Sequence, residues 1–127
     1  MSDQENCTKS GQFGWNELVT TDVDGAKQFY NGLLGWTTQA FGEGGDYMLF
    51  KTNADMAGGL MKCPMPGMPA QWVPYVVVDD VDATTKKTAQ LKGKVAKEPF
   101  DVPNVGRIAV LVDPQGAVIG IFKPKGP

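Results

Sequence analysis

The sequence of 127 residues contains no histidine. Imidazole is the side chain that most often serves as a general base at neutral pH and as a ligand of zinc or iron. Its absence excludes Ser-His-Asp and Cys-His nucleophilic systems, HExxH zinc sites and His-carboxylate iron sites. The sequence therefore excludes several large classes of histidine-dependent hydrolases and metalloenzymes.

Cysteine is also scarce, and Cys7 and Cys63 are too far apart to form a C-x-x-C metal motif or a disulfide framework. We expect both to be free thiols. No apolar run approaches the roughly 20 residues that a membrane-spanning helix needs. Residues 1–9 are polar and lack the apolar core of a signal peptide. These absences predict a cytoplasmic protein with no membrane partner.

An excess of basic charge is missing as well, since 12 lysines and arginines face 14 acidic residues and the formal net charge is -2. The lysines are scattered rather than gathered in a stripe, so nucleic acid is not an expected partner. A hydrophobic content of 42% in 127 residues is enough for one domain with a core. The chain is too short for two conventional domains.

A repeat with one constant offset in residue number organises what is present. At this offset Asp22 to Asp24 matches Asp80 to Asp82, and the Gly-led apolar run at 58–61 matches a second one at 116–119. Such self-similarity indicates two related half-units. We expect residues 1–11 to be a flexible tail and residues 12–124 to form one domain. Its two repeats are 12–62 and 72–124, and the Pro- and Met-rich segment 63–71 links them.

The hydrophobic pattern of each half-unit predicts one strand, one helix and then three strands. Helices are expected to begin at Asp22 and Asp80, whose carboxylates can cap them, and to end at Gly35 and at Gly93. The inward stripes are Ala26, Phe29, Tyr30, Leu33 and Leu34 on the first helix, and Val81, Thr84, Thr88 and Leu91 on the second. Strands are expected over residues 13–20, 36–41, 47–51, 59–62, 73–78, 94–97, 107–112 and 117–123.

Alternation along the strands divides their side chains between two faces. One set is apolar and is expected to pack under the helices: Leu18, Met61, Val76, Val78, Ile108, Val110, Ile119 and Ile121. The other set mixes aromatic, charged and small residues: Trp15, Glu17, Val19, Lys62, Val73, Tyr75, Arg107, Gly120 and Phe122. Aromatic bulk beside a few polar groups is typical of a small-molecule pocket. A solvated sheet face would show the same mixture.

These features together resemble the vicinal oxygen chelate (VOC) superfamily, which includes glyoxalase I, bleomycin-resistance proteins and extradiol dioxygenases. The resemblance covers residues 13–124. It rests on the paired β-α-β-β-β units, the segment DVDGAKQFYNGLLGW at 22–36, and the turn DPQG at 113–116 before the last strand. It implies an α+β fold in which two β-α-β-β-β modules form a curved, partly closed eight-stranded sheet with the helices outside. It also implies a homodimer and a small organic ligand.

In metal-dependent members of that superfamily, a His or Gln in each first strand and a Glu in each fourth strand hold a divalent ion. By register, these positions fall on Trp15, Val73, Lys62 and Gly120. None of the four offers a suitable oxygen or imidazole ligand. We therefore expect neither a divalent metal nor another cofactor, and we do not expect metal-dependent glyoxalase or dioxygenase activity.

The predicted ligand-binding residues are Trp15, Glu17, Lys62, Tyr75, Arg107 and Phe122. If the first and fourth strands pair, Lys62 would lie next to Glu17, and Glu17 is then either a general base or half of a structural ion pair. Arg107 either binds a ligand carboxylate or phosphate or is simply solvated. The aromatic residues either stack on a planar ligand or fill the core. The Met-rich linker could be a lid, a dimer contact or a plain loop.

The sequence thus favours a glyoxalase- or bleomycin-resistance-like module that binds or sequesters a small organic molecule without a metal. The alternative is a lyase, isomerase or dioxygenase that has relocated its metal or uses Glu17 for acid-base chemistry. Whether the protein is an enzyme stays open at this point. A purely structural or protein-interaction role is the third hypothesis, and only the Met-rich linker supports it.

Overall fold

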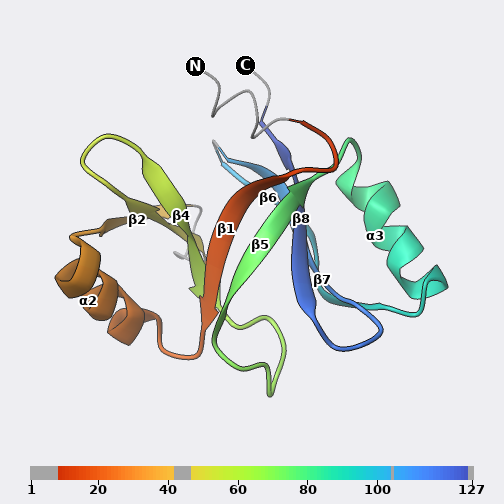
Figure 1. The fold of residues 1–127 in the computed structure, drawn as a ribbon, viewed down its shortest axis with the longest axis horizontal. Helices are drawn as coiled ribbons and strands as arrows, with labels where there is room; N and C mark the ends of the chain where they lie inside the picture. Colours follow the sequence, from red (N-terminus) through yellow and green to blue (C-terminus); the bar gives the residue numbers. More distant parts are fainter. Residues whose placement is uncertain (1–8, 42–46, 104, 126–127) are drawn as a thin grey trace. The chain divides into compact units, whose positions relative to one another are not determined.

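The computed structural model describes residues 9–41, 47–103 and 105–125, which divide into two compact units. The N-terminal unit is Asn16–Trp72, and the C-terminal unit joins the residues up to Trp15 with those from Val73 onward. The elements are β1 (Phe13–Thr20), α2 (Val23–Leu34), β2 (Thr37–Phe41), β3 (Tyr47–Lys51), β4 (Met56–Lys62), β5 (Gln71–Val77), α3 (Val81–Gln90), β6 (Lys94–Val102), β7 (Gly106–Val112) and β8 (Val118–Pro124) (Figure 1). Their order is β-α-β-β-β twice, which confirms the predicted α+β fold class.

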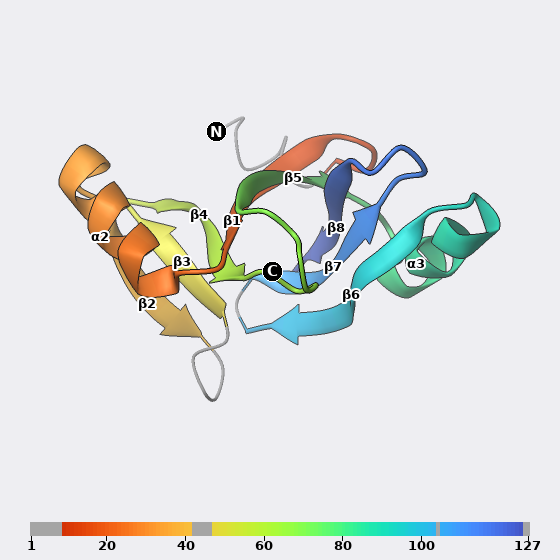
Figure 2. The same ribbon diagram turned by 90° about the horizontal axis from the view of Figure 1, so that it is seen from below.

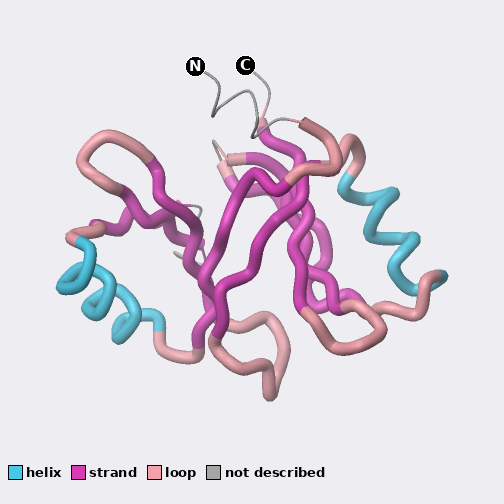
Figure 3. Tube along the Cα trace, in the orientation of Figure 1, coloured by secondary structure: helices cyan, strands magenta, loops and turns pink. Residues whose placement is uncertain are grey.

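The N-terminal unit is a mixed sheet with the strand order β2-β3-β4-β1. β1 is parallel to β4, whereas β3 is antiparallel to both of its neighbours. Helix α2 packs on one face of this sheet (Figure 3). The residues that meet there are Leu18, Phe50 and Leu60 from the strands and Val23, Ala26 and Tyr30 from the helix. This apolar contact is the core of the unit.

The C-terminal unit repeats the arrangement with the strand order β5-β8-β7-β6 (Figure 2). β5 is parallel to β8, and β7 is antiparallel to β8 and β6. Helix α3 packs on one face of this sheet. Its residue Val81 forms an aliphatic cluster there with Ala109, Leu111 and Ile121 of the strands. The chain just before β1 belongs to this unit, because the amide N–H of Val77 donates to the carbonyl oxygen of Gln12 at 2.9 Å.

The helix ends follow from the capping residues. The carboxylate of Asp22 accepts from the amide of Gly25 at 2.9 Å, and that of Asp80 accepts from the amide of Ala83 at 3.0 Å, as predicted. Gly35 ends α2 with a left-handed backbone, φ 74. At the end of α3 the left-handed residue is Lys92, with φ 71, and not the expected Gly93.

The inward stripes of both helices are narrower than expected. On α2, Ala26 and Tyr30 pack on the sheet, whereas Phe29, Leu33 and Leu34 are more than half exposed. On α3, Thr85 is buried and Leu91 is 70% exposed, so the expectation for Leu91 is wrong. Residues four apart stay in line on a helix, and the lines through Tyr30 and Val81 face the sheets. Among the described residues, neither helix is long and apolar enough to cross a membrane.

The expected faces are correct for some strands and reversed for others. Leu18, Ile119 and Ile121 face the helices as predicted. On β7 the helix-facing residues are Ala109 and Leu111, so Ile108 and Val110 lie on the opposite face. Leu60 takes the helix-facing position on β4, which puts Met61 on the opposite face. Both strands have apolar residues at odd and at even positions, so alternation alone could not show which set faces the helix.

Candidate functional site

Glu17 of β1 is the only charged side chain that is buried among the described residues, with 0% exposure. Its neighbour Leu18 packs toward α2, so Glu17 lies on the sheet face opposite to the helix. Across the sheet, Glu17 pairs with Gly59 of β4, and Gly59 pairs with Leu49 of β3. The buried residues that share this face in the N-terminal unit are Val19, Tyr47, Leu49 and Met61.

Burial of a carboxylate costs free energy, because it removes the hydration of the group. Structures keep groups of this kind where hydrogen bonding, catalysis or recognition requires them. Glu17 is therefore the first candidate functional residue of this chain.

The structure corrects the expectation that Lys62 lies next to Glu17. β1 and β4 do pair in parallel, but Lys62 is opposite Thr20, farther along the strand. Lys62 is also two positions from the helix-facing Leu60, so it lies on the other face of the sheet and is exposed. Glu17 and Lys62 form neither an acid-base pair nor a structural ion pair.

The register also identifies the true counterpart of Gly120 in the first module. Glu17 pairs with Gly59, and Tyr75 pairs with Gly120. Tyr75 follows Glu17 by the constant offset of the repeat, whereas Gly120 follows Gly59 by a slightly larger one. The fourth-strand position that the sequence placed at Lys62 therefore belongs to Gly59. Both fourth-strand positions are glycines, and neither supplies a carboxylate.

Tyr75 occupies the space beside Gly120 in the C-terminal unit. A Cβ atom at position 120 would collide with Cδ2 and Cε2 of the Tyr75 ring, so a glutamate could not replace Gly120 without displacing Tyr75. The Phe122 ring stands edge-on to Tyr75, with 6.2 Å between ring centroids. Tyr75 and Phe122 are 0% and 4% exposed, and both contribute to the packing of this face.

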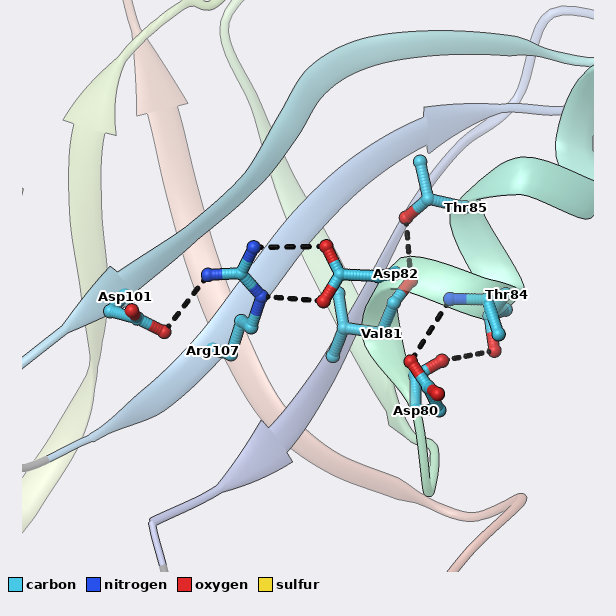
Figure 4. A network of polar contacts seen from close by, with 8 residues as sticks. Asp80, Val81, Asp82, Thr84, Thr85, Asp101 and Arg107 are labelled. Carbon is cyan, nitrogen blue, oxygen red and sulfur yellow. Dashed lines mark hydrogen bonds and ion pairs between the residues drawn. The ribbon is translucent and has the colours of Figure 1, made fainter.

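Arg107 lies in a network with two carboxylates on the helix side of the C-terminal unit (Figure 4). Its Nε and Nη2 atoms donate to Asp82 of α3 at 2.8 and 2.9 Å, and Nη1 donates to Asp101 of β6 at 3.1 Å. The hydrogen bond from Arg107 lowers the pKa of the Asp82 carboxyl, and the two carboxylates raise the pKa of Arg107. Arg107 thus ties α3 to β6 and β7. The expectation that Arg107 lies on the sheet face opposite to the helices is wrong, since Arg107 shares the helix-facing side with Ala109 and Leu111. The sequence pattern also predicted neither Asp82 nor Asp101 as a partner of Arg107.

The remaining predicted positions fit a divalent metal poorly. Trp15 is half-buried, and Val73 is fully buried. Across residues 9–41, 47–103 and 105–125, no three His, Cys, Asp or Glu side chains lie close enough together to hold a metal ion. Hard divalent ions need several oxygen or imidazole ligands. This donor set therefore does not match the metal chemistry of the superfamily that the sequence resembles.

Lys62 instead lines a surface pocket of about 310 Å³ at the linker. The pocket residues are Thr21, Lys62, Cys63, Pro64, Met65, Pro66, Gly67 and Met68. Cys63 is free, as predicted, and burial raises the pKa of its thiol. Cys7 lies outside the described residues. Two methionines of the Met-rich linker thus line a pocket within the N-terminal unit.

Comparison with known families and proteins gives one consistent result. The family model for the Glyoxalase/Bleomycin resistance protein/Dioxygenase superfamily matches residues 12–121. The Mycobacterium bovis protein CFP32, named as a candidate glyoxylase, is 44% identical over 118 residues, which is 91% of this chain and 45% of CFP32. The anthracycline biosynthesis protein DnrV of Streptomyces peucetius is 31% identical over 129 residues, or 89% of this chain and 47% of DnrV.

The chain spans about half the length of these curated relatives. Among solved structures, methylmalonyl-CoA epimerase from Mycobacterium tuberculosis is similar, with a TM-score of 0.57, 17% sequence identity and coverage of 93% of each chain. A likeness at this level of identity concerns the fold only.

Proposed function

Because this chain belongs to the glyoxalase/bleomycin resistance protein/dioxygenase superfamily, we propose that it binds a small organic molecule without a divalent metal. The observation that carries the proposal is the pair of glycines, Gly59 and Gly120, at the two fourth-strand positions. Tyr75 already occupies the space beside Gly120, which leaves no room for a metal-binding side chain there. Binding in this chain would then depend on Glu17 and the buried side chains that share its face of the sheet.

Glu17 sets the charge that the ligand should carry. The two cationic candidates are on the helix-facing sides of their sheets: Lys62 follows Leu60 by two positions, and Arg107 binds Asp82 of α3. The buried charge that can take part in recognition is thus the Glu17 carboxylate, a hydrogen-bond acceptor when ionised. We infer that the ligand presents an N–H, O–H or ammonium group to Glu17, and not the anionic group expected if Arg107 or Lys62 bound it.

Thermal unfolding in the presence of EDTA tests metal-free binding. The wild-type chain is screened with a library of small organic molecules, and a bound ligand raises Tm because it stabilises the folded state. For each hit we expect Glu17→Gln to weaken binding by about tenfold or more, as expected for the loss of a hydrogen bond to a charged group. Asp55→Asn is the matched control, since Asp55 is an exposed carboxylate of the same unit.

Two outcomes contradict the proposal. One is stabilisation that disappears in EDTA and returns with added Mn²⁺, which would show that binding requires a metal. The other is the absence of any stabilising ligand in the library. Equal weakening by Glu17→Gln and Asp55→Asn would remove Glu17 from the site while leaving metal-free binding intact.

A matched set of probes tests the charge of the ligand separately. 1-Naphthylmethylamine, 1-naphthylmethanol and 1-naphthylacetate share one aromatic body and differ in the polar group. We expect the amine to bind most tightly and the carboxylate most weakly, and we expect the difference to shrink in Glu17→Gln. Preference for the carboxylate would contradict the assignment of Glu17 as the recognition group.

The position of Glu17 also favours a second candidate function, acid-base catalysis. Lys62 is on the opposite face, so an ion pair between the two residues does not account for the buried carboxylate. A carboxylate in this setting can take a proton from a carbon next to a carbonyl group and return it. Catalysed exchange of that proton in D₂O, followed by NMR and lost in Glu17→Gln, would support the enzyme over the binding module.

A further inference from the structure

Sulfur is distributed unevenly along the chain, and three sulfur side chains fall in one short loop. The sequence has two cysteines and six methionines, and none of them lies beyond residue 68. Cys63, Met65 and Met68 belong to the segment 63–68, which follows β4 and leads toward β5 (Figure 1). The strands β5 to β8 of the second module contain no sulfur at all. The β-α-β-β-β fold therefore does not require these side chains for its core.

The loop backbone brings the two methionines close together. Met65 and Met68 are the first and fourth residues of a tight turn, in which the amide N–H of Met68 donates to the carbonyl oxygen of Met65 at 3.3 Å. Pro66 at the second position and Gly67 at the third, with φ 79, match a type II β-turn. Such a turn places the Cα atoms of its two ends within about 7 Å of each other. The two thioether side chains thus start from neighbouring points of the backbone.

Cys63 is held beside this turn by two hydrogen bonds. Its amide N–H donates to the carbonyl oxygen of Thr20 at 3.0 Å, which anchors it at the end of β1. Its thiol donates to the carbonyl oxygen of Pro69 at 3.9 Å, directly after Met68. The loop therefore folds back toward the thiol. Cys63, Met65 and Met68 are each partly buried, and all three line the same pocket of about 310 Å³.

The donor atoms of this pocket favour a soft, singly charged ion. One thiolate and two thioethers are soft ligands, and such ligands select Cu(I) among the common metal ions. Structural zinc sites take four ligands from Cys, His, Asp and Glu, and Cys63 is the one such residue in the pocket lining. Lys62 lines the same pocket, and its positive charge disfavours a divalent ion. A Cu(I) ion bound to one thiolate carries no net charge.

We propose that Cys63, Met65 and Met68 form a binding site for a Cu(I) ion. Binding exchanges the thiol proton for the metal: the Cys63 sulfur releases H⁺ to solvent and bonds to Cu(I), and each thioether sulfur donates a lone pair. No electron is transferred, because the copper enters as Cu(I). The weak hydrogen bond from the thiol to Pro69 is given up in this exchange. The inference is independent of the proposed function, since Glu17 is not among the pocket residues.

Competition with the chromogenic Cu(I) chelator bicinchoninate, under nitrogen and with ascorbate as reductant, tests this site. We expect the wild-type chain to withdraw one Cu(I) ion per molecule from the coloured complex. Cys63→Ser removes the thiolate and should abolish this withdrawal. The matched control is Cys7→Ser, which removes the other cysteine of the chain and should leave both the stoichiometry and the affinity unchanged.

The double variant Met65→Leu, Met68→Leu tests the thioethers without removing apolar bulk. Loss of outer-shell support alone costs about 10- to 100-fold in metal affinity, so loss of two direct ligands should raise the Cu(I) dissociation constant by about 100-fold or more. Met56→Leu is the matched control, because Met56 of β4 is exposed and lies outside the pocket lining. Cu(I) should raise Tm of the wild type and of Met56→Leu more than that of the double variant, since bound metal stabilises the folded state.

Four outcomes would overturn the proposal. One is a wild-type chain that withdraws no Cu(I) from bicinchoninate. A second is an unchanged dissociation constant in Met65→Leu, Met68→Leu, which would show that the thioethers are not ligands. A third is an equal loss of binding in Cys7→Ser and Cys63→Ser, which would place the copper elsewhere. The last is Zn²⁺ binding as tight as Cu(I) binding in the same wild-type chain, which would contradict a soft-metal site.

Discussion

The two modules share one topology but place different residues at equivalent positions. Glu17 and Tyr75 are related by the constant offset of the repeat, and each pairs with a glycine of the fourth strand. In the first module the position holds a buried carboxylate, and in the second it holds a buried aromatic ring. The fourth-strand glycine is therefore common to both modules, whereas the first-strand residue that pairs with it differs. Only the first module has a charged group at this position.

The helix sides of the modules also differ. In the N-terminal unit, which includes Trp72, the rings of Tyr30, Trp36, Phe50 and Trp72 contact one another. In the C-terminal unit, an aliphatic cluster around Val81 lies beside the Arg107 network. One module thus relies on aromatic packing, and the other combines aliphatic packing with ionic hydrogen bonds.

The largest expected effect removes the centre of the aromatic packing. Phe50 is fully buried and contacts three other rings, so Phe50→Ala should lower the free energy of unfolding by about 4 kcal/mol. Leu111→Ala, in the aliphatic cluster of the second module, should cost about 3 kcal/mol. Urea denaturation measures both. A larger loss for Leu111→Ala would show that the second module dominates the stability of the chain.

The glycine beside Tyr75 should be the next most sensitive position. Gly120→Ala brings a methyl group into the Tyr75 ring and should cost about 2–3 kcal/mol. Gly32→Ala, on the exposed side of α2, should instead stabilise the chain by about 0.5–1 kcal/mol. Urea denaturation measures the change in the free energy of unfolding for both variants. A decrease for Gly120→Ala together with an increase for Gly32→Ala would confirm the close approach of Tyr75 to Gly120. An unchanged stability for Gly120→Ala would mean that Tyr75 moves aside easily.

The helix caps should be equivalent in the two modules. Asp22→Ala and Asp80→Ala each remove a carboxylate that accepts a first-turn amide, and each should cost about 1 kcal/mol. The Asn variants keep an acceptor and should recover most of the loss. Chemical denaturation of the four variants checks this. If only one of the two Asp→Ala variants lost stability, the cap of the other helix would contribute nothing, and that helix would be held by tertiary packing alone.

The smallest effect, but the one with a defined pH dependence, concerns Arg107. The hydrogen bond from Arg107 lowers the pKa of Asp82 in the folded state, so its stabilisation is present above the unfolded pKa, about 4, and is lost as the pH falls below it. The stability difference between wild type and Arg107→Gln should therefore be larger at pH 6 than at pH 3. Lys27→Gln, the control for an exposed ion pair, should have little effect at either pH.

Most of the fold could be predicted because its signals are local. Asp22, Asp80 and Gly35 mark helix ends through their own backbone contacts, and the structure places them there. The helix-facing residues of β7 were assigned to the wrong face, because this strand has apolar residues at both odd and even positions. The exposure of Leu33 was missed for a related reason: a broad apolar stripe does not reveal how much of it the sheet covers.

The candidate site was harder to predict because it depends on register. One constant offset fits the first strands and the helices, but the second module is slightly longer between its helix and its last strand. Carrying the single offset through the chain put Lys62 in the place of Gly59. The partners of Arg107 were missed because Asp82 and Asp101 are distant in sequence, and only tertiary structure brings them to the same guanidinium.

The ring contact between Trp36 and Trp72 within one unit has an optical consequence. The ring centroids of Trp36 and Trp72 lie 6.1 Å apart in the same aromatic cluster, whereas Trp15 belongs to the C-terminal unit. Indole emission depends on the immediate surroundings of the ring, so these tryptophans form natural reporters of different units. Fluorescence of Trp15→Phe would therefore follow the unfolding of the N-terminal unit without an added label.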